Sequence, residues 1–477
     1  MDESCCVPPR SSRRFDVAVV GAGSAGFSAA ITAAEQGAQV ALIGHGTIGG
    51  TCVNIGCVPS KTMIRAAEAL HAARAASRFP GLAGEAHVTD WRRLVAAKDD
   101  LVSTLRQKKY VDLLPAYDGV AYLEGPARLS GTGIAAVNGE AVRSDRIIIA
   151  TGASPALPDI PGVADVPYLT STTALELTAL PRSLIVVGGG YIGCELAQML
   201  ARAGVAVTLV TRSRLLPEAE PEVAEALTGF LRDEGIAVRT GLQYRRVEHA
   251  AAGIAMVIEA DGAAETVSAE QLLLATGRAP NTGGLGLQGA GVRVSASGAV
   301  IVDDRMRTTK AGVYAAGDVT GTDQFVYMAA YGAKLAALNA LNGNRLVYDN
   351  AAMPWVVFTD PQVAGVGLTE AAARIEGLET KTSVVPLDQV PRALAARDTR
   401  GLIKLVADAK TDRLLGGQIL APEGADSIQT LALALKHHMT AKDLGETIFP
   451  YLTTVEGLKL AALGFVMDVT KLSCCAG

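Results

Sequence analysis

Residues 15–26 of the chain read FDVAVVGAGSAG, and residues 184–193 read LIVVGGGYIG. Each stretch is a short apolar run, typical of a buried strand, that leads into the spacing G-x-G-x-x-G and then into a helical pattern and a second strand. This order predicts a β-α-β unit that holds the pyrophosphate of a dinucleotide at the N-terminus of its helix. One match alone is a weak signal, but two matches in the right context are a strong one. The glycines that we expect to bind cofactor are Gly21, Gly23, Gly26, Gly188, Gly190 and Gly193.

Further turns divide the chain into predicted domains. The apolar runs 147–149 and 272–274 each lead into Ala-Thr-Gly, which we interpret as the crossovers into and out of the second nucleotide domain. From about residue 350 strands and amphipathic helices follow without another glycine fingerprint, which is typical of a separate α+β domain. We therefore predict an α/β protein with two Rossmann-like domains and a C-terminal α+β domain. The predicted boundaries are a tail over 1–13, a first nucleotide domain over 14–152 and 275–347, a second over 153–274, and an interface domain over 348–477.

The composition favours a globular enzyme and argues against several other classes. The chain has 477 residues, a length that suffices for about three domains at roughly 150 residues each. Hydrophobic residues make up 49% of it, enough to form a large core. The formal net charge of -5 and the lack of a long basic run argue against nucleic acid or anionic membrane partners. No apolar stretch reaches the ~18 residues of a membrane helix, and the start, MDESCCVPPRSSRRF, lacks the apolar core of a secretory signal. Because the cysteine count of 7 is odd, we expect a reducing compartment and a cytoplasmic enzyme.

Charges at the end of each second strand bear on which nucleotide each domain takes. An acid there bonds a ribose 2′-hydroxyl, whereas an arginine accommodates a 2′-phosphate. In the second domain the strand ending at Val210 is followed by Arg212 and Arg214 and by no acid, which favours NADPH over NADH. The alternative is that these arginines only form a solvated loop. In the first domain the same position falls at Gly44, in LIGHG, so the ribose contact expected from an acid is missing.

Two pairs of cysteines carry the chemical signal. Cys52 and Cys57 lie in GGTCVNIGCVPSK (49–61), and Cys474 and Cys475 are adjacent near the C-terminus. Adjacent Cα atoms are about 3.8 Å apart, below the roughly 4.4–6.8 Å span of a disulfide, so the second pair is better suited to hold a soft metal ion as two thiolates. A redox pair and a thiol pair that stays reduced together suggest chemistry on a thiophilic metal. The competing interpretations are a structural role for the first pair and an inert tail for the second.

These motifs together resemble those of the flavoprotein disulfide reductases, the family that includes glutathione reductase and dihydrolipoamide dehydrogenase. The resemblance runs from about residue 15 to 477 and includes both Ala-Thr-Gly turns, AAGD at 315–318 and VVFTDPQVAGVGLTE at 356–370. The segment FPYLTTVEGLKLAA (449–462) and the ending KLSCCAG are similar to the mercury(II)-reducing branch of that family. The N-terminal metal-trafficking domain with a spaced cysteine motif, present in many members of that branch, is missing from the sequence.

The resemblance implies a glutathione-reductase-like homodimer with FAD in the first nucleotide domain, NADPH in the second and a C-terminal dimerisation domain. Each active site would take residues from both subunits. Cys57 would be the thiolate in charge transfer with the flavin, and Cys52 the exchange thiol. The other residues implied are Lys61 paired with Glu195 beside the flavin, Tyr191 over the flavin face where nicotinamide docks, Asp318 at the ribityl chain, and Gly50, Thr51, Thr151 and Gly152 in the FAD site.

The resemblance also reveals a chemical departure near the C-terminus. Disulfide reductases of this family protonate the departing thiolate with a His–Glu dyad, but in that register this chain has Tyr451 and Glu456. A phenol with a reference pKa of about 10 is a poor acid at neutral pH beside imidazole at about 6.5. Mercury instead needs thiolates that stay deprotonated. We therefore expect Hg(II) to be reduced to Hg(0) at Cys52 and Cys57. Cys474 and Cys475 of the partner subunit would deliver the ion, so all four cysteines would be metal ligands.

Several alternatives stay open at this point. Among enzymes, the runner-up is a reductase of lipoamide or glutathione disulfide; outside enzymes, it is a flavoprotein that binds mercury without turnover. Cys194 is predicted to be a small buried hydrophobe, and the Cys5-Cys6 pair is either an idle tail or a mercury scavenger. Tyr191 is open to a simple packing role.

Overall fold

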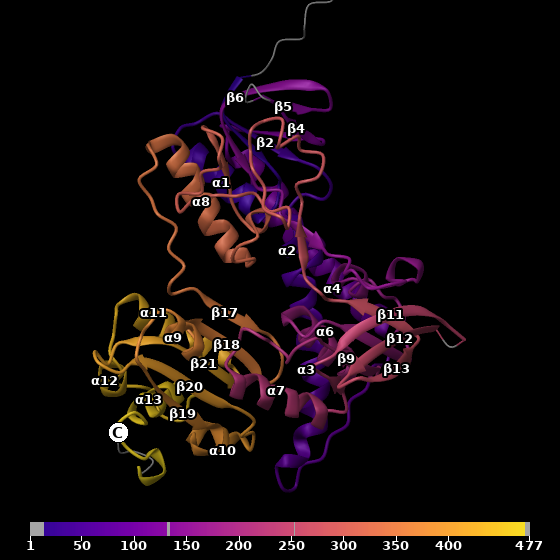
Figure 1. Cartoon of the computed structure of the whole chain (residues 1–477), viewed down its shortest axis with the longest axis vertical. Coiled ribbons are helices and arrows are strands. Elements are labelled where there is room, and N and C mark those ends of the chain that lie inside the picture. The colour runs from indigo at the N-terminus through magenta and orange to yellow at the C-terminus, as the bar shows by residue number, and fades with distance from the viewer. Residues whose placement is uncertain (1–13, 131–133, 252, 473–477) are drawn as a thin grey trace, which may run out of the picture. The chain divides into compact units, whose positions relative to one another are not determined.

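The computed structural model describes residues 14–130, 134–251 and 253–472. These residues form two compact units, each built from three stretches of the chain (Figure 1). The first unit combines 14–60 with Ala96–Ala156 and Arg278–Tyr348; the second combines Lys61–Val95 with Leu157–Gly277 and 349–472. In the described ranges, no helix is both long enough and apolar enough to cross a bilayer.

A seven-stranded sheet forms the centre of the first unit. Its strand order is β3-β2-β1-β6-β5-β4, and β16 pairs with β6 on the side. The central pairs β3–β2, β2–β1, β1–β6 and β6–β16 are parallel, whereas β5 runs antiparallel to both β6 and β4. The strands are β1 (Arg14–Val20), β2 (Val40–Gly44), β3 (Val120–Glu124), β4 (Ala127–Leu129), β5 (Ile134–Val137), β6 (Glu140–Ile149) and β16 (Val313–Ala315).

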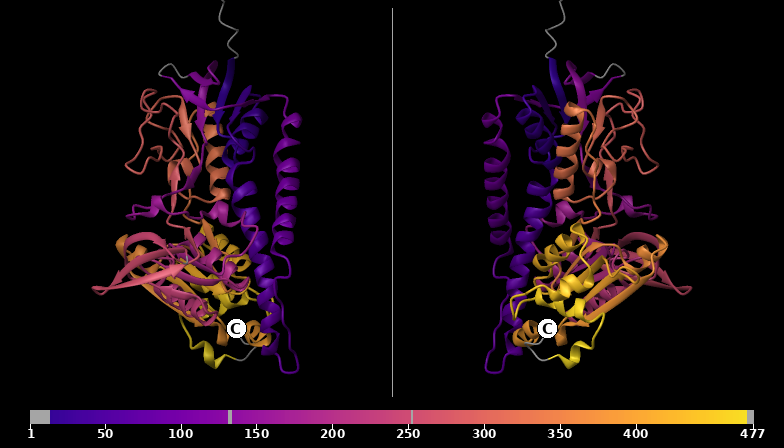
Figure 2. Two further views of the ribbon diagram at one scale, coloured as in Figure 1. Left: turned by 90° about the vertical axis from the view of Figure 1, so that its right-hand side faces the viewer. Right: turned by 90° about the vertical axis from the view of Figure 1, so that its left-hand side faces the viewer.

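The apolar runs seen in the sequence explain why this sheet is buried on both faces. Along β1, Val17 and Val19 belong to the core under two helices, while Ala18 and Val20 belong to the core on the opposite face. Parallel strands are usually buried on both faces, so their sequences are continuous apolar runs and do not alternate between apolar and polar residues. The two helices are α1 (Ser24–Glu35) and α8 (Val326–Asn342), which lie side by side in Figures 1 and 2 although they are far apart in sequence.

The second unit contains the second β-α-β element that the sequence predicts. Its parallel sheet has the order β10-β9-β8-β14, and a three-stranded antiparallel sheet, β11-β12-β13, accompanies it. These strands are β8 (Ser183–Val187), β9 (Ala206–Val210), β10 (Ala237–Arg239), β11 (Gln243–Ala250), β12 (Gly253–Ala260), β13 (Ala263–Ala269) and β14 (Gln271–Leu274). Helix α6 (Tyr191–Arg202) follows β8 directly and buries Leu196 and Leu200 in the core of this region.

The C-terminal part of the second unit is an α+β element, as the sequence predicts. A five-stranded antiparallel sheet has the order β17-β18-β21-β20-β19. Its strands are β17 (Pro354–Val357), β18 (Gln362–Gly367), β19 (Thr380–Pro386), β20 (Leu402–Asp408) and β21 (Leu414–Ala421). Helices α11 (Gly424–Lys436), α12 (Ala441–Glu446) and α13 (Glu456–Leu463) pack on it through a shared apolar core.

The remaining elements are shorter connections and helices. The α-helices are α2 (Gly50–Ile55), α3 (Cys57–Arg74), α4 (Trp91–Arg106), α5 (Ser171–Ala174), α7 (Pro221–Asp233), α9 (Glu370–Ile375) and α10 (Pro391–Ala396). The short helical turns are η1 (Ala75–Arg78), η2 (Gln107–Val111), η3 (Leu114–Ala116), η4 (Val163–Asp165), η5 (Asp318–Thr320), η6 (Leu387–Gln389) and η7 (Val469–Lys471). Strands β7 (Ala153–Pro155) and β15 (Arg278–Pro280) form an antiparallel pair.

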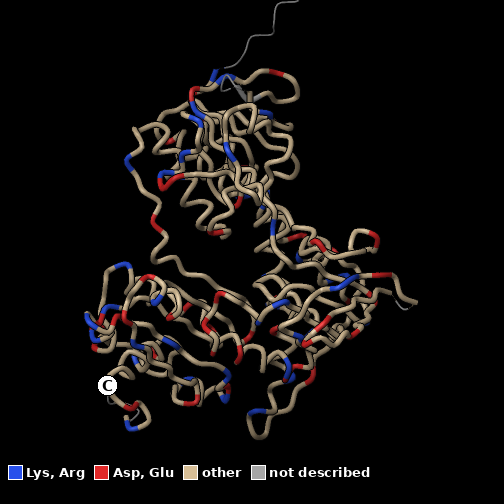
Figure 3. The backbone as a smooth tube through the Cα atoms, viewed as in Figure 1, with Lys and Arg blue, Asp and Glu red and all other residues tan. Residues whose placement is uncertain are grey.

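Charged residues of both signs are interspersed along the described chain, as Figure 3 shows. Among the buried charged side chains of the described residues is Lys404, whose ammonium group lies 3.0 Å from Glu220, 2.9 Å from Glu222 and 3.0 Å from Glu370. An unpaired ammonium group would be costly in such a place, and three carboxylates compensate it. This cluster ties β20 to the start of α7 within the second unit.

The predicted fold class is confirmed. Two Rossmann-like elements and an α+β element are present in the order predicted. The division into three functional domains stays a prediction.

Candidate active site

The glycine turn after β1 is built for close backbone contacts. Gly21 has a φ of +118°, and a Cβ atom there would lie 2.2 Å from the carbonyl oxygen of Ala150, so only glycine fits. A Cβ atom at Gly26 would lie 1.7 Å from the Gly21 carbonyl oxygen, which lets α1 pack tightly against β1. Gly23 precedes α1 without a side-chain cap, and the first turn of α1 carries no acid. The free N–H groups at this helix end suit a pyrophosphate group.

The segment that carries the first cysteine pair lies against this turn. The Gly49 N–H donates to the Ala22 carbonyl oxygen at 2.8 Å, and a Cβ atom at Gly50 would lie 2.6 Å from the Cα atom of Gly23. Gly50 also has a φ of +65°, a conformation that favours glycine. The predicted residues Gly50 and Thr51 thus begin α2 beside the glycine turn.

Cys52 and Cys57 lie on either side of a helix break. Cys52 belongs to the short helix α2, Gly56 interrupts it with φ -127° and ψ -112°, and Cys57 begins α3. Both cysteines are half-buried. A thiol at the N-terminus of a helix of 18 residues is in a position where the helix dipole favours the thiolate.

Neighbouring groups in the first unit respond to charge on these cysteines. Burial raises the pKa of the Tyr110 hydroxyl, the hydrogen bond with Ser24 lowers it, and negative charge on Cys52 and Cys57 raises it again. Burial lowers the pKa of Arg278, while the negative charges of Asp318 and Cys57 raise it. A guanidinium group near Cys57 therefore adds to the helix dipole in favouring a thiolate there.

Arg278 also links the cysteine region to the predicted ribityl contact. Its Nε atom lies 3.8 Å from the Asp318 carboxylate, and its guanidinium donates to the carbonyl oxygen of Ala153. Burial raises the pKa of Asp318, and Arg278 lowers it. Arg278 was not among the predicted site residues, although it directly follows the second Ala-Thr-Gly turn.

The first Ala-Thr-Gly turn has a holding role in the structure. The Thr151 hydroxyl donates to the carbonyl oxygen of Asn281 at 2.7 Å, and the Asn281 side chain donates back to the Thr151 carbonyl oxygen at 2.9 Å. Gly152 has a φ of +71°, and its carbonyl oxygen accepts from the Asn281 N–H at 2.9 Å. These contacts fasten the two crossover segments together in the first unit. Cofactor contacts for Thr151 and Gly152 stay a prediction.

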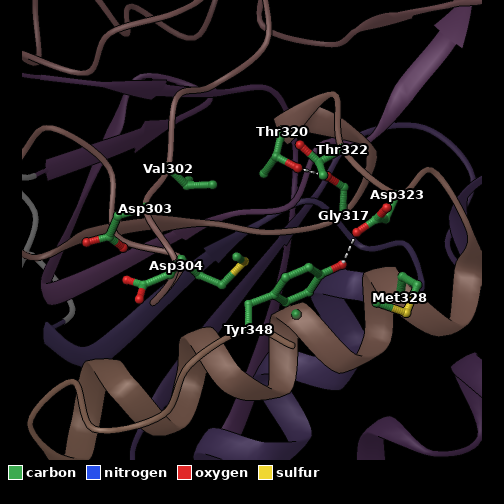
Figure 4. Close-up of a pocket in the computed structure, with 11 residues that line it drawn as sticks. Val302, Asp303, Asp304, Gly317, Thr320, Thr322, Asp323, Met328 and Tyr348 are labelled. Atoms are coloured by element: carbon green, nitrogen blue, oxygen red, sulfur yellow. Dashed lines mark hydrogen bonds between the residues drawn. The ribbon is translucent and has the colours of Figure 1, made fainter. Parts of the chain in front are cut away.

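A cavity of about 180 Å³ in the first unit has Gly317 in its lining (Figure 4). In this view the Tyr348 hydroxyl points at Asp323, to which it donates at 3.0 Å. Asp303, which also lines the cavity, is paired with Arg307. Because these acids already have partners, we assign no catalytic role to the cavity.

Lys61 and Glu195 form the ion pair that the resemblance implies. The Lys61 ammonium group lies 2.6 Å from Glu195, which is only 5% exposed, and 4.8 Å from the ring centre of Phe358. The second carboxylate oxygen of Glu195 accepts from the Phe358 N–H at 2.9 Å. Lys61 is one turn after Cys57 on α3, so both side chains are on one face of that helix.

Tyr191 begins α6 and is stacked on Trp355, which was not among the predicted site residues. The rings of Tyr191 and Trp355 are 5.5 Å apart with an interplanar angle of 24°. The indole lies over Gly365, where a Cβ atom would be 2.4 Å from it. A glycine in the neighbouring strand β18 therefore makes room for the Trp355 side chain.

The second glycine turn repeats the geometry of the first. Gly188 has a φ of +115°, with a hypothetical Cβ atom 2.3 Å from the Ala275 carbonyl oxygen, and a Cβ atom at Gly193 would lie 1.9 Å from the Gly188 carbonyl oxygen. Around Gly190, before α6, nothing lies within 4 Å of such an atom. This open backbone suits the close approach of a nucleotide.

The two predicted arginines after β9 differ in their contacts. The Arg212 guanidinium lies 5.0 Å from the ring centre of Tyr244 and is exposed. The Arg214 guanidinium donates to the carbonyl oxygens of Pro217 and Ala219, both at 2.7 Å. Both arginines are exposed, but Arg214 is fixed by hydrogen bonds to its own loop, whereas Arg212 lies over the Tyr244 ring.

Tyr451 and Glu456 belong to a turn of the second unit. Tyr451 is 46% exposed, and Glu456, the first residue of α13, accepts from the Leu452 N–H at 3.0 Å. Their predicted role stays a prediction, because it involves a second subunit.

The remaining metal prediction concerns residues that the structure leaves out. Cys474 and Cys475, like Cys5 and Cys6, lie outside the described residues. Within the described ranges, no group of three or more His, Cys, Asp or Glu side chains is arranged to hold a metal ion. Cys194 is fully buried in α6; burial raises the pKa of its thiol, and the charge of Glu195 raises it further. This agrees with the predicted role of Cys194 as a small buried hydrophobe.

Comparisons with known proteins bear on the resemblance. Residues 15–337 match the family model of the pyridine nucleotide-disulphide oxidoreductases, and residues 353–462 match the dimerisation domain of the same family. The mercuric reductase of Bacillus cereus is 48% identical over 464 residues, which are 97% of this chain and 73% of the relative. The mercuric reductase of Streptomyces lividans is 45% identical over 472 residues, which are 97% of this chain and 98% of the relative.

A solved structure agrees with these matches. The Cu(II) complex of the HOCl-induced flavoprotein disulfide reductase RclA from Escherichia coli has a TM-score of 0.84 at 30% identity, covering 95% of this chain and 100% of that one. The matches confirm the predicted fold class and the predicted enzyme class, an oxidoreductase similar to mercuric reductases. The chain therefore belongs to the pyridine nucleotide-disulphide oxidoreductase family.

Proposed function

We propose that this enzyme reduces Hg(II) to Hg(0) with electrons from NADPH that reach Cys52 and Cys57 through FAD. The observation that carries the proposal is the cysteine pair across the Gly56 break, with one thiol at the start of α3 and a guanidinium group nearby. The names of the relatives at 45% and 48% identity supply the substrate class.

The residues around the first glycine turn fit an FAD molecule. Gly21, Gly23 and Gly26 would hold its pyrophosphate, because the turn offers helix N–H groups and no competing acid. Gly50 and Thr51 would line the same turn, and Asp318 would bond the ribityl chain. When bound, FAD and NADPH supply the two electrons of the reaction.

The second glycine turn fits NADPH. Gly188 and Gly193 allow the tight turn before α6, the space at Gly190 is open, and Arg212 is exposed after the end of β9. Tyr191, at the start of α6, would cover the nicotinamide site, and the buried Glu195 would hold Lys61 in place beside the flavin. The buried Glu195 side chain has both carboxylate oxygens occupied, so this pair is held in a single orientation.

The cysteines hold the ion while it is reduced. A soft Hg(II) ion prefers thiolate ligands, and the helix dipole and Arg278 both favour the thiolate of Cys57. The ion accepts two electrons and leaves as Hg(0), and both sulfur atoms remain thiolates, so no proton has to be supplied. A tyrosine at position 451 in place of a histidine is compatible with such a reaction.

Delivery of the ion would involve a second copy of the chain. The dimerisation-domain match supports a homodimer, as do exposed apolar side chains in that region, since Ile448 is 94% and Val466 76% exposed. Cys474 and Cys475 of the partner subunit would take Hg(II) from small thiols and pass it to Cys52 and Cys57 by ligand exchange.

The proposal is tested with purified holoenzyme, NADPH and thiol-complexed Hg(II). We expect steady NADPH consumption together with release of elemental mercury, and little turnover of lipoamide or glutathione disulfide. Cys57→Ser should abolish mercury reduction, whereas Cys194→Ala, which changes a buried thiol, should leave it intact. The double variant Cys474→Ala, Cys475→Ala should lose turnover of thiol-complexed mercury but keep flavin reduction by NADPH.

Two other results would each contradict the proposal. Rapid turnover of oxidised dithiols without mercury vapour would identify a disulfide reductase. A single stoichiometric burst of NADPH oxidation would identify a protein that binds mercury without reducing it. Undiminished mercury turnover in the tail double variant would overturn the delivery step alone.

A further inference from the structure

The end of β2 lacks the acid that usually contacts an adenosine ribose, and a tyrosine from the next strand occupies the space. A Cβ atom at Gly44 would lie 2.5 Å from the Tyr122 hydroxyl oxygen and 2.8 Å from both the Tyr122 Cε2 atom and the Cβ atom of Ala22. Tyr122 is on β3, opposite Leu42 in the parallel register, and its long side chain reaches the end of β2. The phenol therefore lies where an acidic side chain at position 44 would begin.

Ala22 fixes the place of the phenol relative to the cofactor turn. Ala22 is the middle residue of the Gly21-Ala22-Gly23 turn, and a side chain at position 44 would meet both Ala22 and Tyr122. The Tyr122 hydroxyl is thus beside the turn that would hold the pyrophosphate, on the side where the second strand ends. In β-α-β nucleotide sites the ribose lies at this position.

The hydroxyl itself has unused hydrogen-bonding capacity. Tyr122 is half-buried, yet among the residues that the structure describes its hydroxyl has no hydrogen-bond partner. Burial raises the pKa of Tyr122, and the charge of Glu124 raises it further, so the phenol keeps its proton and can both donate and accept. A polar group in this position is satisfied when a ligand hydroxyl binds to it.

We propose that the Tyr122 hydroxyl binds a ribose hydroxyl of the adenosine half of FAD, in place of the acid that Gly44 lacks. This inference rests on the proposed FAD site. A carboxylate is charged and can only accept hydrogen bonds. The phenol is neutral, and it can either donate a hydrogen bond to the ribose hydroxyl or accept one from it. Gly44 is then required by the tyrosine, rather than being a simple loss of a contact.

The test measures FAD binding to apoprotein by quenching of flavin fluorescence. Removing one neutral hydrogen bond with Tyr122→Phe should weaken FAD binding by about two- to tenfold. The same variant should bind an FAD analogue with a 2′,3′-dideoxyadenosine half as tightly as the unchanged protein does, because the ligand then lacks the partner group. Tyr168→Phe, which alters an exposed tyrosine of the second unit, is the matched control and should change neither affinity.

The two ligands separate a hydrogen bond from packing. Equal FAD affinity in the unchanged protein and Tyr122→Phe would overturn the inference, and so would an equal loss for FAD and the analogue. This comparison holds even where the variant lowers the melting temperature of the apoprotein, since both ligands meet the same protein. If the unchanged apoprotein took up no FAD, the cofactor assignment itself would fail, which is a different result.

Discussion

At the scale of single residues, Arg212 and Arg214 show how much a contact adds to a sequence pattern. Both follow β9 and both are cations, so the sequence treats them as equivalent for a 2′-phosphate. In the structure the Arg214 guanidinium donates two hydrogen bonds to carbonyl oxygens of its own loop, whereas the Arg212 guanidinium lies over the Tyr244 ring. The choice of NADPH over NADH should therefore depend on Arg212.

We expect Arg212→Ala to weaken NADP⁺ binding by about 10- to 100-fold, the effect of losing a charged hydrogen bond, and to leave NAD⁺ binding unchanged. Arg214→Ala should weaken both nucleotides to a similar degree, because the loop itself loosens. Titration of both variants with both nucleotides measures the effect. A selective loss of NADP⁺ affinity in Arg214→Ala instead would contradict this division.

Some site residues could be predicted from sequence because their requirement is local. In both fingerprints the first glycine needs a positive φ angle, and a Cβ atom on the first or the last glycine would lie only 1.7 to 2.3 Å from a neighbouring carbonyl oxygen. Tyr122, Arg278 and Trp355 could not be predicted in this way, since each acts through a partner far along the chain. The Lys61–Glu195 pair came from the resemblance, because no local pattern joins residues 134 positions apart.

At the scale of elements, the β17–β18 pair positions an aromatic stack. Trp355 on β17 is directly opposite Gly365 on β18, and its indole continues over that glycine to stack on Tyr191. The Tyr191 side chain, predicted to cover the nicotinamide site, is therefore held by a strand pair of the C-terminal sheet. Packing of this kind depends on one small residue.

We expect Gly365→Ala to lower the free energy of unfolding by about 1–3 kcal/mol, because the new methyl group collides with the indole. In a Trp355→Ala background the same change should cost almost nothing. Denaturant titration gives the energies, and tryptophan emission in a Trp91→Phe background reports the indole of Trp355, since the chain has only 2 tryptophans. Gly229→Ala, at an open helix position, is the control.

An equal cost of Gly365→Ala in both backgrounds would show that the indole is not the obstacle. The elements themselves were largely predictable, since apolar runs and glycine turns mark both β-α-β units. The break at Gly56 was not predicted, although a glycine is a common residue at the end of a helix.

At the scale of the whole molecule, each compact unit is assembled from three separate stretches of chain. In the second unit a charged network joins all three: Arg202 lies 2.7 Å from Glu234 and 3.0 Å from Asp360, and His71 lies 3.9 Å from Glu234. Sequence patterns within one element cannot reveal such a network, because its members are up to 289 positions apart, from His71 to Asp360. The order of the elements and a first domain built from two separate stretches were predicted, whereas this charged network was not.

The network makes stability depend on pH. Burial lowers the pKa of His71, and the positive charge of Arg202 lowers it further, against the opposing effect of Glu234. The unfolded chain therefore binds a proton near pH 6.5 while the folded chain still does not. The contribution of the neutral His71 to the free energy of unfolding is fully present above pH 6.5. It is lost as the pH falls below 6.5, by up to about 1.4 kcal/mol per pH unit.

Denaturant titrations between pH 5 and 8 measure this loss. We expect His71→Gln to flatten the decline between about pH 6.5 and 5 relative to the unchanged protein. Parallel curves for the two proteins would show that His71 does not cause it. His437→Gln, at an exposed position, is the control and should leave the curve as it is.

The burial of Cys194 matters for an enzyme whose proposed substrate is a poison of thiols. Of the three cysteines in the described part of the chain, Cys194 alone is buried, and burial raises the pKa of its thiol, so the thiol stays protonated. The Cys194 thiol, in the helix that follows the second glycine turn, is therefore not exposed to an ion in the proposed nucleotide site. We therefore expect that a substitution that exposes Cys194 to solvent would make the enzyme more sensitive to inactivation by Hg(II).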